Sequence, residues 1–300
     1  MAVVTTSATI TGLLNLAQTM QPYRIVTMRI SGNLKHQPSA HLESWQQFIH
    51  EEPLEHRETL RLLSYNIQVG IHTRQYRDYL LRSWQHLLPH TKREHNLQQI
   101  AELIQHFDLI ALQEVDGGSF RSKYTNQISY LAKAANKQFW HQQLNRNLGR
   151  FAQHSNGVIG DITPVSIQNH SLPGLRGRGA IAVELGQKDP LLIVIAHLAL
   201  SRQAQNQQLA YIKDLIERYQ HVVIMGDLNT DSMRILYDSP LQNSGLKSSH
   251  SGATYPSWRP MKGFDQILLS QHINIRKVAV LDFALSDHLP VAIEIESPHL

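Results

Sequence analysis

Four short apolar runs, each ending in polar residues, constrain the fold of this chain more than any other feature. They occur in "LRLLSYNIQVG", "FDLIALQEV", "LLIVIAHLAL" and "HVVIMGDLN". Each run has the length and the β-branched content of a strand that is buried on both faces. The sequence therefore predicts sheets with apolar layers on both sides, as in an α/β protein.

Helical patterns come directly before two of these runs. Apolar residues spaced three and four apart cover residues 97–107, before the run that begins at 109, and residues 209–219, before the run that begins at 222. Such spacing places the apolar side chains on one face of a helix. The alternation of helix and strand again predicts a layered α/β fold, and the polar strand ends are where such folds assemble their sites.

Composition narrows the class of protein. A chain of 300 residues that is 42% apolar and 17% charged can bury a sizeable core, and its net charge of +4 allows a phosphate-bearing partner without requiring one. The absence of cysteine excludes disulfides, thiolate zinc sites and cysteine nucleophiles. With no apolar stretch long enough to span a bilayer and no basic secretory start, we expect a cytoplasmic protein without a transmembrane segment, and we expect a monomer.

The N-terminal part of the chain differs from the rest. Residues 1–57 show no sustained periodicity, although "HLESWQQFIHEEPLEH" could form one short helix. The strand and helix patterns begin near residue 58. We therefore expect an N-terminal extension over 1–57 and one domain over 58–298.

The polar residues at the strand ends are ambiguous one by one but informative together. Alone, Asn66 fits a turn, and His197 fits a hydrogen-bonded core residue. Together, the polar residues near the strand ends supply oxygen ligands and two histidines that can transfer protons: Asn66, Glu114, Asp227, Asn229, Asp265, Asp287, His197 and His288. Carboxylate and amide oxygens without thiolates suit Mg²⁺ or Mn²⁺, which bind phosphate oxygens. The set indicates phosphoryl chemistry.

Six motifs in order resemble the endonuclease/exonuclease/phosphatase superfamily: "SYNIQ", "LQEVD", "AHL", "GDLN", "FDQILLS" and "SDHLPV". The resemblance extends over roughly residues 58–297. It implies a four-layer α/β sandwich, with two mixed β-sheets packed face to face and helices outside. It also implies a metal site at one rim of the sandwich.

The resemblance further implies which residues bind the metal and the phosphate. Asn66 and Glu114 would hold a divalent cation, Mg²⁺ or Mn²⁺, and Asp287 would be a further ligand from the opposite side. Asp227 and Asn229, from "GDLN", would bind and orient the attacking water and the scissile phosphate. The expected reaction is hydrolysis of a phosphoester by in-line attack of water.

The two histidines would handle protons. Asp265 would hydrogen-bond His288 and fix its tautomer, so that the other ring nitrogen acts on water as a general base. If Asp227 takes the proton instead, His288 stabilises the phosphate, and the sequence leaves both assignments open. His197, in "AHL", would contact the phosphate and assist the leaving group.

Two more residues would support the substrate. Asn156 occupies the place of the family's Gly-Asn-Ala segment, and Arg178 lies in "LRGRGAIAVEL", which resembles the Arg-Gly-Ala start of a family strand. Gly160 and Asp161 replace the usual Ser-Arg or Ser-Lys, which removes the phosphate contact expected at that place. Several other basic residues in loops could form a rim for phosphates: Arg176, Arg202, Lys247, Arg259 and Lys262.

The substrate stays open among three alternatives. A nuclease acting on DNA or RNA is slightly preferred. Residues 127–146 and 150–165 resemble the sphingomyelinase and deoxyribonuclease side of the superfamily, which disfavours the abasic-site endonuclease branch. The second alternative is a hydrolase of phospholipids or of small phosphodiesters and phosphomonoesters. The third is a non-catalytic binding module, which is disfavoured because every motif keeps its polar residues. Met225 and Asp231 stand where the inositol-phosphatase branch has Trp and Arg, which disfavours that branch.

Overall fold

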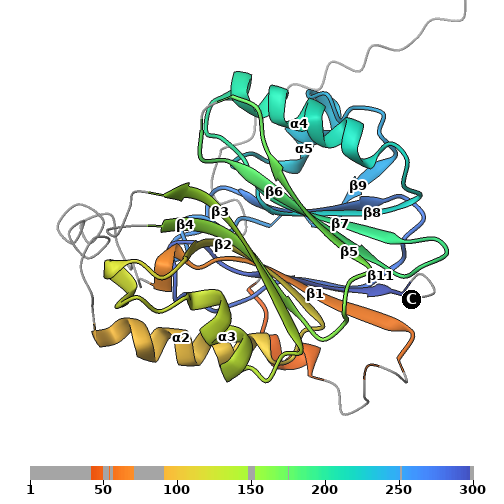
Figure 1. Cartoon of the computed structure of the whole chain (residues 1–300). Coiled ribbons are helices and arrows are strands. Elements are labelled where there is room, and N and C mark those ends of the chain that lie inside the picture. Colours follow the sequence, from red (N-terminus) through yellow and green to blue (C-terminus); the bar gives the residue numbers. More distant parts are fainter. Residues whose placement is uncertain are drawn as a thin grey trace, which may run out of the picture. The chain divides into compact units, whose positions relative to one another are not determined.

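Two six-stranded sheets form the centre of the protein (Figure 1). The computed structural model describes residues 42–49, 54, 57–70, 91–147, 153–174, 176–250 and 252–297. Both sheets are mixed. In the first sheet β1 and β2 are parallel, in the second β7 and β8 are parallel, and the other neighbouring strands are antiparallel. The predicted sandwich of two mixed sheets with helices outside is confirmed.

The first sheet has the strand order β11-β12-β1-β2-β4-β3. Its strands are β1 (Thr59–Asn66), β2 (Leu109–Asp116), β3 (Phe139–Asn147), β4 (Gln153–Gly160), β11 (Ile275–Val280) and β12 (Val291–Glu296). The last strand of the chain, β12, pairs antiparallel with β1 in the register Ser64 to Val291. The segment before β12 is thereby brought to the carboxyl end of β1.

The second sheet has the strand order β5-β6-β7-β8-β10-β9. Its strands are β5 (Ser166–Ser171), β6 (Gly179–Leu185), β7 (Leu191–His197), β8 (His221–Asp227), β9 (Leu246–Ser248) and β10 (Asp265–Ser270). In this sheet Asp227 is opposite His197 on one side and Asp265 on the other. These three polar residues therefore lie side by side where the three strands end or begin.

Helices cover the outer face of each sheet. Figure 1 shows α2 (Thr91–Ile104) and α3 (Gln127–Ala134) against the first sheet, and α4 (Arg202–Ile216) and α5 (Ser232–Tyr237) against the second. Three short 3₁₀ segments complete the described elements: η1 (Trp45–Phe48), η3 (Gln68–Gly70) and η5 (Phe120–Ser122). No helix in the described parts of the chain is long and apolar enough to cross a membrane.

The layering explains why the strands are apolar at consecutive positions. Alternate residues of a strand point to opposite faces. In β7, Ile193 and Ile195 pack between the two sheets, whereas Leu192 and Val194 pack under α4. The same division holds in β1, where Leu62 faces the other sheet. Each inner strand thus has an apolar layer on both faces, as its sequence predicts.

Part of the segment that precedes β1 packs on the first sheet. Phe48 is fully buried in the core between this sheet and its helices, with its ring 5.6 Å from that of Phe107. The Arg61 guanidinium donates a hydrogen bond to the Phe48 carbonyl over 2.8 Å, and Glu43 bridges to Leu281. Residues 42–49 share the core of the domain, so we propose a domain that starts before residue 58.

Candidate active site

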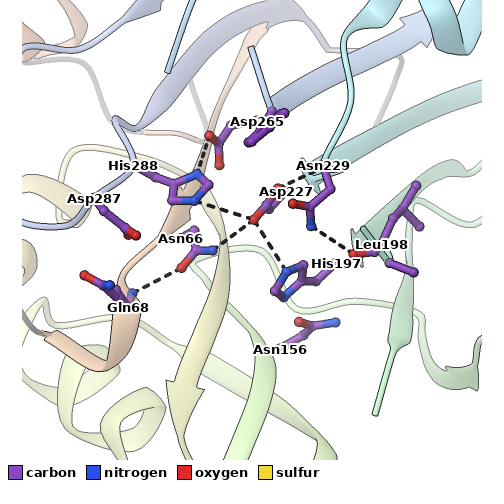
Figure 2. Close-up of polar contacts among 12 residues, drawn as sticks. Asn66, Gln68, Asn156, His197, Leu198, Asp227, Asn229, Asp265, Asp287 and His288 are labelled. Atoms are coloured by element: carbon purple, nitrogen blue, oxygen red, sulfur yellow. Dashed lines mark hydrogen bonds and ion pairs between the residues drawn. The ribbon is translucent and has the colours of Figure 1, made fainter. Parts of the chain in front are cut away.

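The polar residues singled out in the sequence come together at one edge of the sandwich (Figure 2). β1, β2, β7 and β8 end there, and β10 and β12 begin there because each is antiparallel to one of them. Strand topology, rather than proximity in the sequence, gathers this set: Asn66, Glu114, His197, Asp227, Asp265, Asp287 and His288.

Asp227 lies at the centre of this group. Its Oδ2 atom accepts a hydrogen bond from Nδ2 of Asn66 over 3.0 Å. The same oxygen is 3.5 Å from Nε2 of His197 and 3.8 Å from Nε2 of His288. The carboxylate of Asp227 is therefore shared by an amide from the first sheet and two imidazole rings.

The Gly-Asp-Leu-Asn turn has a backbone that few other sequences allow. Gly226 has φ 144°, and a Cβ atom on it would lie 1.9 Å from the carbonyl oxygen of Ala196 in the neighbouring strand. Asn229 has φ 52°; its amide N–H donates to Oδ1 of Asp227 and its Nδ2 donates to the Leu198 carbonyl. Glycine and asparagine are the residues that adopt such conformations at least cost. The turn fixes the Asp227 carboxylate between the strands.

Glu114 also has an unusual backbone. Its φ is 54°, and the pairing of β2 with β4 shifts register between Leu112 and Val115. The bulge turns the half-buried Glu114 side chain toward a pocket at the sheet edge. Among the described residues its carboxylate has no hydrogen-bond donor, which leaves both oxygens available to a ligand. Strained positions of this kind often occur at functional sites.

His288 is held by Asp265. Nδ1 of His288 lies 2.7 Å from Oδ2 of Asp265, and both side chains are buried. Because the carboxylate accepts, Nδ1 carries a proton and Nε2 faces Asp227. The ring of Tyr255 packs against His288, with the ring centroids 4.9 Å apart. The imidazole therefore has a fixed orientation.

Charge and burial set the protonation of the two histidines in opposite directions. Burial acts against a charged His288, but the negative charges of Asp265 and Asp227 outweigh it and raise the pKa of this ring well above 6.5. Burial and the positive charges of Arg178 and His288 hold the pKa of His197 well below 6.5. At neutral pH His288 is the protonated ring and His197 the neutral one.

The buried carboxylates repel one another. Burial raises the pKa of Asp227 to about 7, with Asp265 and Glu114 adding to the rise and His288 opposing it. Burial raises the pKa of Asp287 to about 6, and the charge of Glu114 adds to that rise. A site that accumulates uncompensated negative charge is suited to a cation.

Two groups of residues could hold a divalent cation. The first is Asn66, Glu114 and Asp287, which offer oxygen atoms from β1, from β2 and from the segment before β12; among the described residues, no hydrogen-bond donor engages the carboxylate of Glu114. The second is Asp227, Asp265 and His288, whose ligand atoms lie within 4.8 Å of one another. Enzymes of this fold generally use a divalent metal. The first group fits a hard cation better, because Asp265 and His288 already satisfy each other.

Asn156 and Arg178 line a pocket beside His197 and Glu114. Nδ2 of Asn156 donates to the Gly179 carbonyl over 2.9 Å, while its Oδ1 is buried and has no partner among the described residues. Burial lowers the pKa of Arg178, and the carboxylates of Asp227 and Glu114 act to raise it. Both residues therefore present polar groups to the same pocket, at the side of Asp227.

Sequence reasoning missed several contributors to this edge. Arg146 and His154 also line the pocket. They belong to β3 and β4, whose polar sequences show no strand pattern, so no local signal marks them. The ring of Tyr255 stacks on that of Phe264 and lies tilted against that of His288, so Tyr255 belongs to the packing around this histidine.

A model of the Endonuclease/Exonuclease/phosphatase family matches residues 63–288. A search of curated proteins finds no match.

Solved structures share the fold at low identity. A family protein from Leptotrichia buccalis C-1013-b has a TM-score of 0.63 at 15% identity, covering 79% of this chain and 100% of its own. One from Beutenbergia cavernae DSM 12333 has a TM-score of 0.59 at 19% identity, covering 80% and 72%. The mannosyl-6-phosphatase Bt3783 of Bacteroides thetaiotaomicron VPI-5482 has a TM-score of 0.59 at 15% identity, covering 79% and 99%.

Proposed function

The chain belongs to the endonuclease/exonuclease/phosphatase family of phosphoester hydrolases, and from that premise we propose that it is a Mg²⁺-dependent phosphodiesterase, Mn²⁺ being the alternative ion. The observation that carries the proposal is the placement of Asp227 between two imidazole rings, one of which is held by Asp265. The group joins a carboxylate, a neutral ring and a protonated ring, and its neutral ring, His197, lines a pocket. This arrangement can position water and move its proton.

Asn66, Glu114 and Asp287 are the proposed ligands of the divalent cation. When bound, the cation neutralises charge on the phosphate and on the leaving oxygen. The chain's own contribution is to hold Asn66 at the end of β1, Glu114 at the bulge of β2 and Asp287 in the segment before β12. Asn66 is fixed further by two hydrogen bonds, one to Asp227 and one from the Gln68 amide over 3.1 Å.

His288 is the proposed general base. Asp265 keeps the proton on Nδ1, so that Nε2 accepts the proton of the attacking water once the ring is neutral. Asp227 lies within 3.8 Å of the same nitrogen and orients that water. If Asp227 is the base instead, His288 serves as a positive group beside the phosphate. The pH dependence of kcat separates the two roles.

Neutral His197 and the pocket residues are proposed to bind the scissile phosphate. His197 can donate one ring N–H to a phosphate oxygen without adding a buried charge. Arg178 supplies a positive charge on the same side, and Asn156 lines the wall beside it. Asn229 acts at one remove, because its amide groups hold Asp227 and Leu198 in place.

Nucleic acid is the proposed substrate in preference to small phosphoesters. Residues 127–146 and 150–165 resemble the sphingomyelinase and deoxyribonuclease side of the superfamily, so a phospholipid stays an alternative to nucleic acid. The structural likeness to a mannosyl-6-phosphatase keeps a small phosphomonoester as the second candidate. We also propose a monomer, which light scattering of the purified protein tests.

A substrate panel tests the proposed function. The full chain is incubated with plasmid DNA, RNA, bis(p-nitrophenyl) phosphate, mannose 6-phosphate and sphingomyelin, in Mg²⁺, Mn²⁺, Zn²⁺ or excess EDTA. We expect hydrolysis in Mg²⁺ or Mn²⁺ and none in EDTA. Hydrolysis that persists in EDTA, or that requires Zn²⁺, contradicts the metal assignment. Binding of nucleic acid without hydrolysis of any substrate identifies a binding module instead.

Two variants make the panel specific to this site. His288→Ala removes the proposed base, so hydrolysis should fall by about 10² to 10⁴. His272→Ala is the matched control, because His272 is an exposed histidine that contacts His221 at the opposite end of β8. Equal activity of both variants would locate the chemistry elsewhere.

A further inference from the structure

A pocket of about 440 Å³ adjoins the proposed catalytic group. His197 and Glu114 form the side toward Asp227, and three arginines contribute to the remainder: Arg146, Arg176 and Arg178. A phosphodiester carries a single negative charge. Three guanidinium groups therefore outnumber the negative charges of one such phosphate and of Glu114 together.

These arginines lack the partners that other arginines of the chain have. Within the described residues, none of the three forms a hydrogen bond or an ion pair, although Arg178 feels the charges of Asp227 and Glu114. By contrast, Arg202, which we expected in a loop but which begins α4, is paired with Asp238 over 2.6 Å. Positive charges that outnumber the negative charges beside them favour binding of an anion.

The wall of the pocket is tightly built. A Cβ atom on Gly179 would lie 2.3 Å from Oδ1 of Asn145 and 2.5 Å from Oε1 of Gln143, so β3 and the start of β6 are in close contact. Gly177 has φ 100°, and a Cβ there would lie 3.4 Å from the Cβ of Arg146. Side chains of β3 thus pack against the backbone at Gly177 and Gly179, and Arg146 lies beside the turn that follows Arg176.

A second observation also indicates a ligand. Asn156 is 1% exposed and lines the pocket, and its Oδ1 atom has no hydrogen-bond partner among the described residues. A buried acceptor without a donor costs about 1–3 kcal/mol, so such an atom is normally satisfied by water or by a ligand. A hydroxyl of a bound sugar phosphate would satisfy it. The pocket thus combines positive charge with a buried acceptor.

We infer that this pocket binds a second phosphate group of the substrate, next to the scissile one, through Arg146 and Arg176. The inference rests on the proposed function, since it assumes that the scissile phosphate lies between Asp227 and Arg178. Arg178 interacts electrostatically with the carboxylates of Asp227 and Glu114, whereas Arg146 and Arg176 are exposed to solvent. Substrates with two phosphates should therefore be preferred to substrates with one.

Two sources could supply the second phosphate: the neighbouring nucleotide of a nucleic acid, or the other end of a small bisphosphate. Matched pairs distinguish them. The dinucleotide dTpdT is compared with its 5′-phosphorylated and 3′-phosphorylated forms, and glucose 1-phosphate is compared with glucose 1,6-bisphosphate. The measured quantity is the ratio of kcat/KM within each pair, in Mg²⁺.

The expected ratio is roughly tenfold to hundredfold in favour of the member with the additional phosphate, the range for one or two charge-assisted hydrogen bonds. The pair that shows it identifies the source. In Arg146→Gln and in Arg176→Gln the ratio should fall toward one. Arg218→Gln is the matched control, since Arg218 is an exposed arginine just before β8, whose other end carries Asp227, and it should keep the ratio.

Failure of the inference differs from failure of the proposed function. Hydrolysis of every substrate with ratios near one, or unchanged ratios in both arginine variants, overturns the second phosphate site and leaves the phosphodiesterase intact. Absence of all hydrolysis contradicts the proposed function. The pocket is then tested by calorimetric binding of inorganic pyrophosphate and inorganic phosphate in EDTA. Tighter binding of pyrophosphate that both arginine variants weaken supports the site, and equal binding overturns it.

Discussion

Nδ1 of His288 lies 2.7 Å from Oδ2 of Asp265, and the opposite nitrogen of the same ring lies 3.8 Å from Asp227. Asp265 begins β10 in the second sheet, whereas His288 precedes β12 in the first sheet. The hydrogen bond therefore ties the two sheets together at the candidate site. A ring held in this way has one tautomer and one orientation, which is what a general base requires.

The first prediction is that Asp265 and His288 act as one unit. His288→Ala should lower kcat by about 10² to 10⁴. Asp265→Asn should also slow turnover, because its amide can present NH₂ to the ring and favour the other tautomer. The double variant should lose far less than the product of the two single losses, since groups acting together are non-additive. Rate measurements on the three variants check this.

Circular dichroism and thermal unfolding of the same variants are the control, because a variant that fails to fold says nothing about the dyad. Multiplicative losses in folded proteins would mean that Asp265 and His288 act independently. The proposal of an oriented base would then be abandoned, even with both residues essential.

The second prediction concerns the pH dependence of the rate. Burial opposes the charged form of His288, but Asp265 and Asp227 outweigh it and hold its pKa well above 6.5. A base works only when unprotonated, so kcat should still rise with pH above neutrality. In Asp265→Asn one negative charge is removed from the ring, so the inflection should move to lower pH while the plateau falls.

A rate profile measured between pH 5 and 9.5 in both proteins checks this. The opposite trend, with activity lost as pH rises through neutrality, would indicate that protonated His288 is the working form. That outcome assigns the base to Asp227 and leaves His288 as a positive group beside the phosphate.

The sequence predicted the layers of this fold because every inner strand is apolar at consecutive positions. Ile193 and Leu192 face different cores, so neither face of β7 could carry polar residues. The place of the site was predictable for a related reason: a polar residue that ends such a strand must lie where the neighbouring strands also end. His197 and Asp227, which end β7 and β8, are opposite each other in the register of these strands.

The parts that the sequence did not predict include the outermost strands of the two sheets. β3 and β5 are edge strands with half-exposed polar residues, so alternation between apolar and polar positions is absent from them. Arg146, on β3, therefore carried no signal of its place in the pocket. Phe48 is a similar case: one aromatic residue fills the core from a segment that has no periodicity of its own.

The third prediction concerns Gly226. In the parallel register Gly226 is opposite Ala196, and an added Cβ would lie 1.9 Å from the Ala196 carbonyl oxygen. Gly226→Ala should therefore separate β8 from β7 and destabilise the fold by about 3 kcal/mol or more, with loss of activity. Gly245→Ala is the matched control, because Gly245 also has positive φ but has nothing within 4 Å of its Cβ position. It should cost only about 1–2 kcal/mol. Urea unfolding compares them, and equal losses would contradict the clash.

The fourth prediction concerns the start of the domain. A boundary near residue 58 predicts that a chain lacking residues 1–50 folds normally. Phe48, however, is buried against Phe107, and its carbonyl accepts from Arg61. Phe48→Ala should cost about 3–5 kcal/mol, and deletion of 1–50 should cost at least as much. Deletion of 1–38 keeps all of residues 42–49 and is the matched control for the longer deletion.

Thermal unfolding of these three proteins beside the full chain checks the fourth prediction. Ile49→Ala is a control for the point variant, since Ile49 is adjacent to Phe48 but 43% exposed. A deletion of 1–50 as stable as the full chain would show that residues 42–49 contribute nothing to the core.

The last prediction concerns His250 and stability at acidic pH. Burial lowers the pKa of His250 from 6.5 to about 4, although the charge of Asp265 acts to raise it. Its Nε2 is buried and has no partner among the described residues, so the fold favours the neutral ring. In the unfolded chain the ring takes up a proton near pH 6.5. The stability contributed by His250 is therefore fully present above pH 6.5 and is lost as pH falls toward 4. The loss is at most roughly 3 kcal/mol, an upper bound because the residue is partly exposed.

The comparison of the full chain with His250→Asn isolates this contribution. Asparagine does not titrate, whereas the buried carboxylates of Asp227 and Asp287, whose raised pKa values act in the opposite direction, are common to both proteins. The free energy of unfolding in urea is measured at pH 7, 5.5 and 4.5. We expect the advantage of the native chain over the variant to shrink steadily as the pH falls. A difference that stays constant over this range would mean that His250 is as easily protonated in the folded protein as in the unfolded chain, so that its burial beside Asp265 carries no cost.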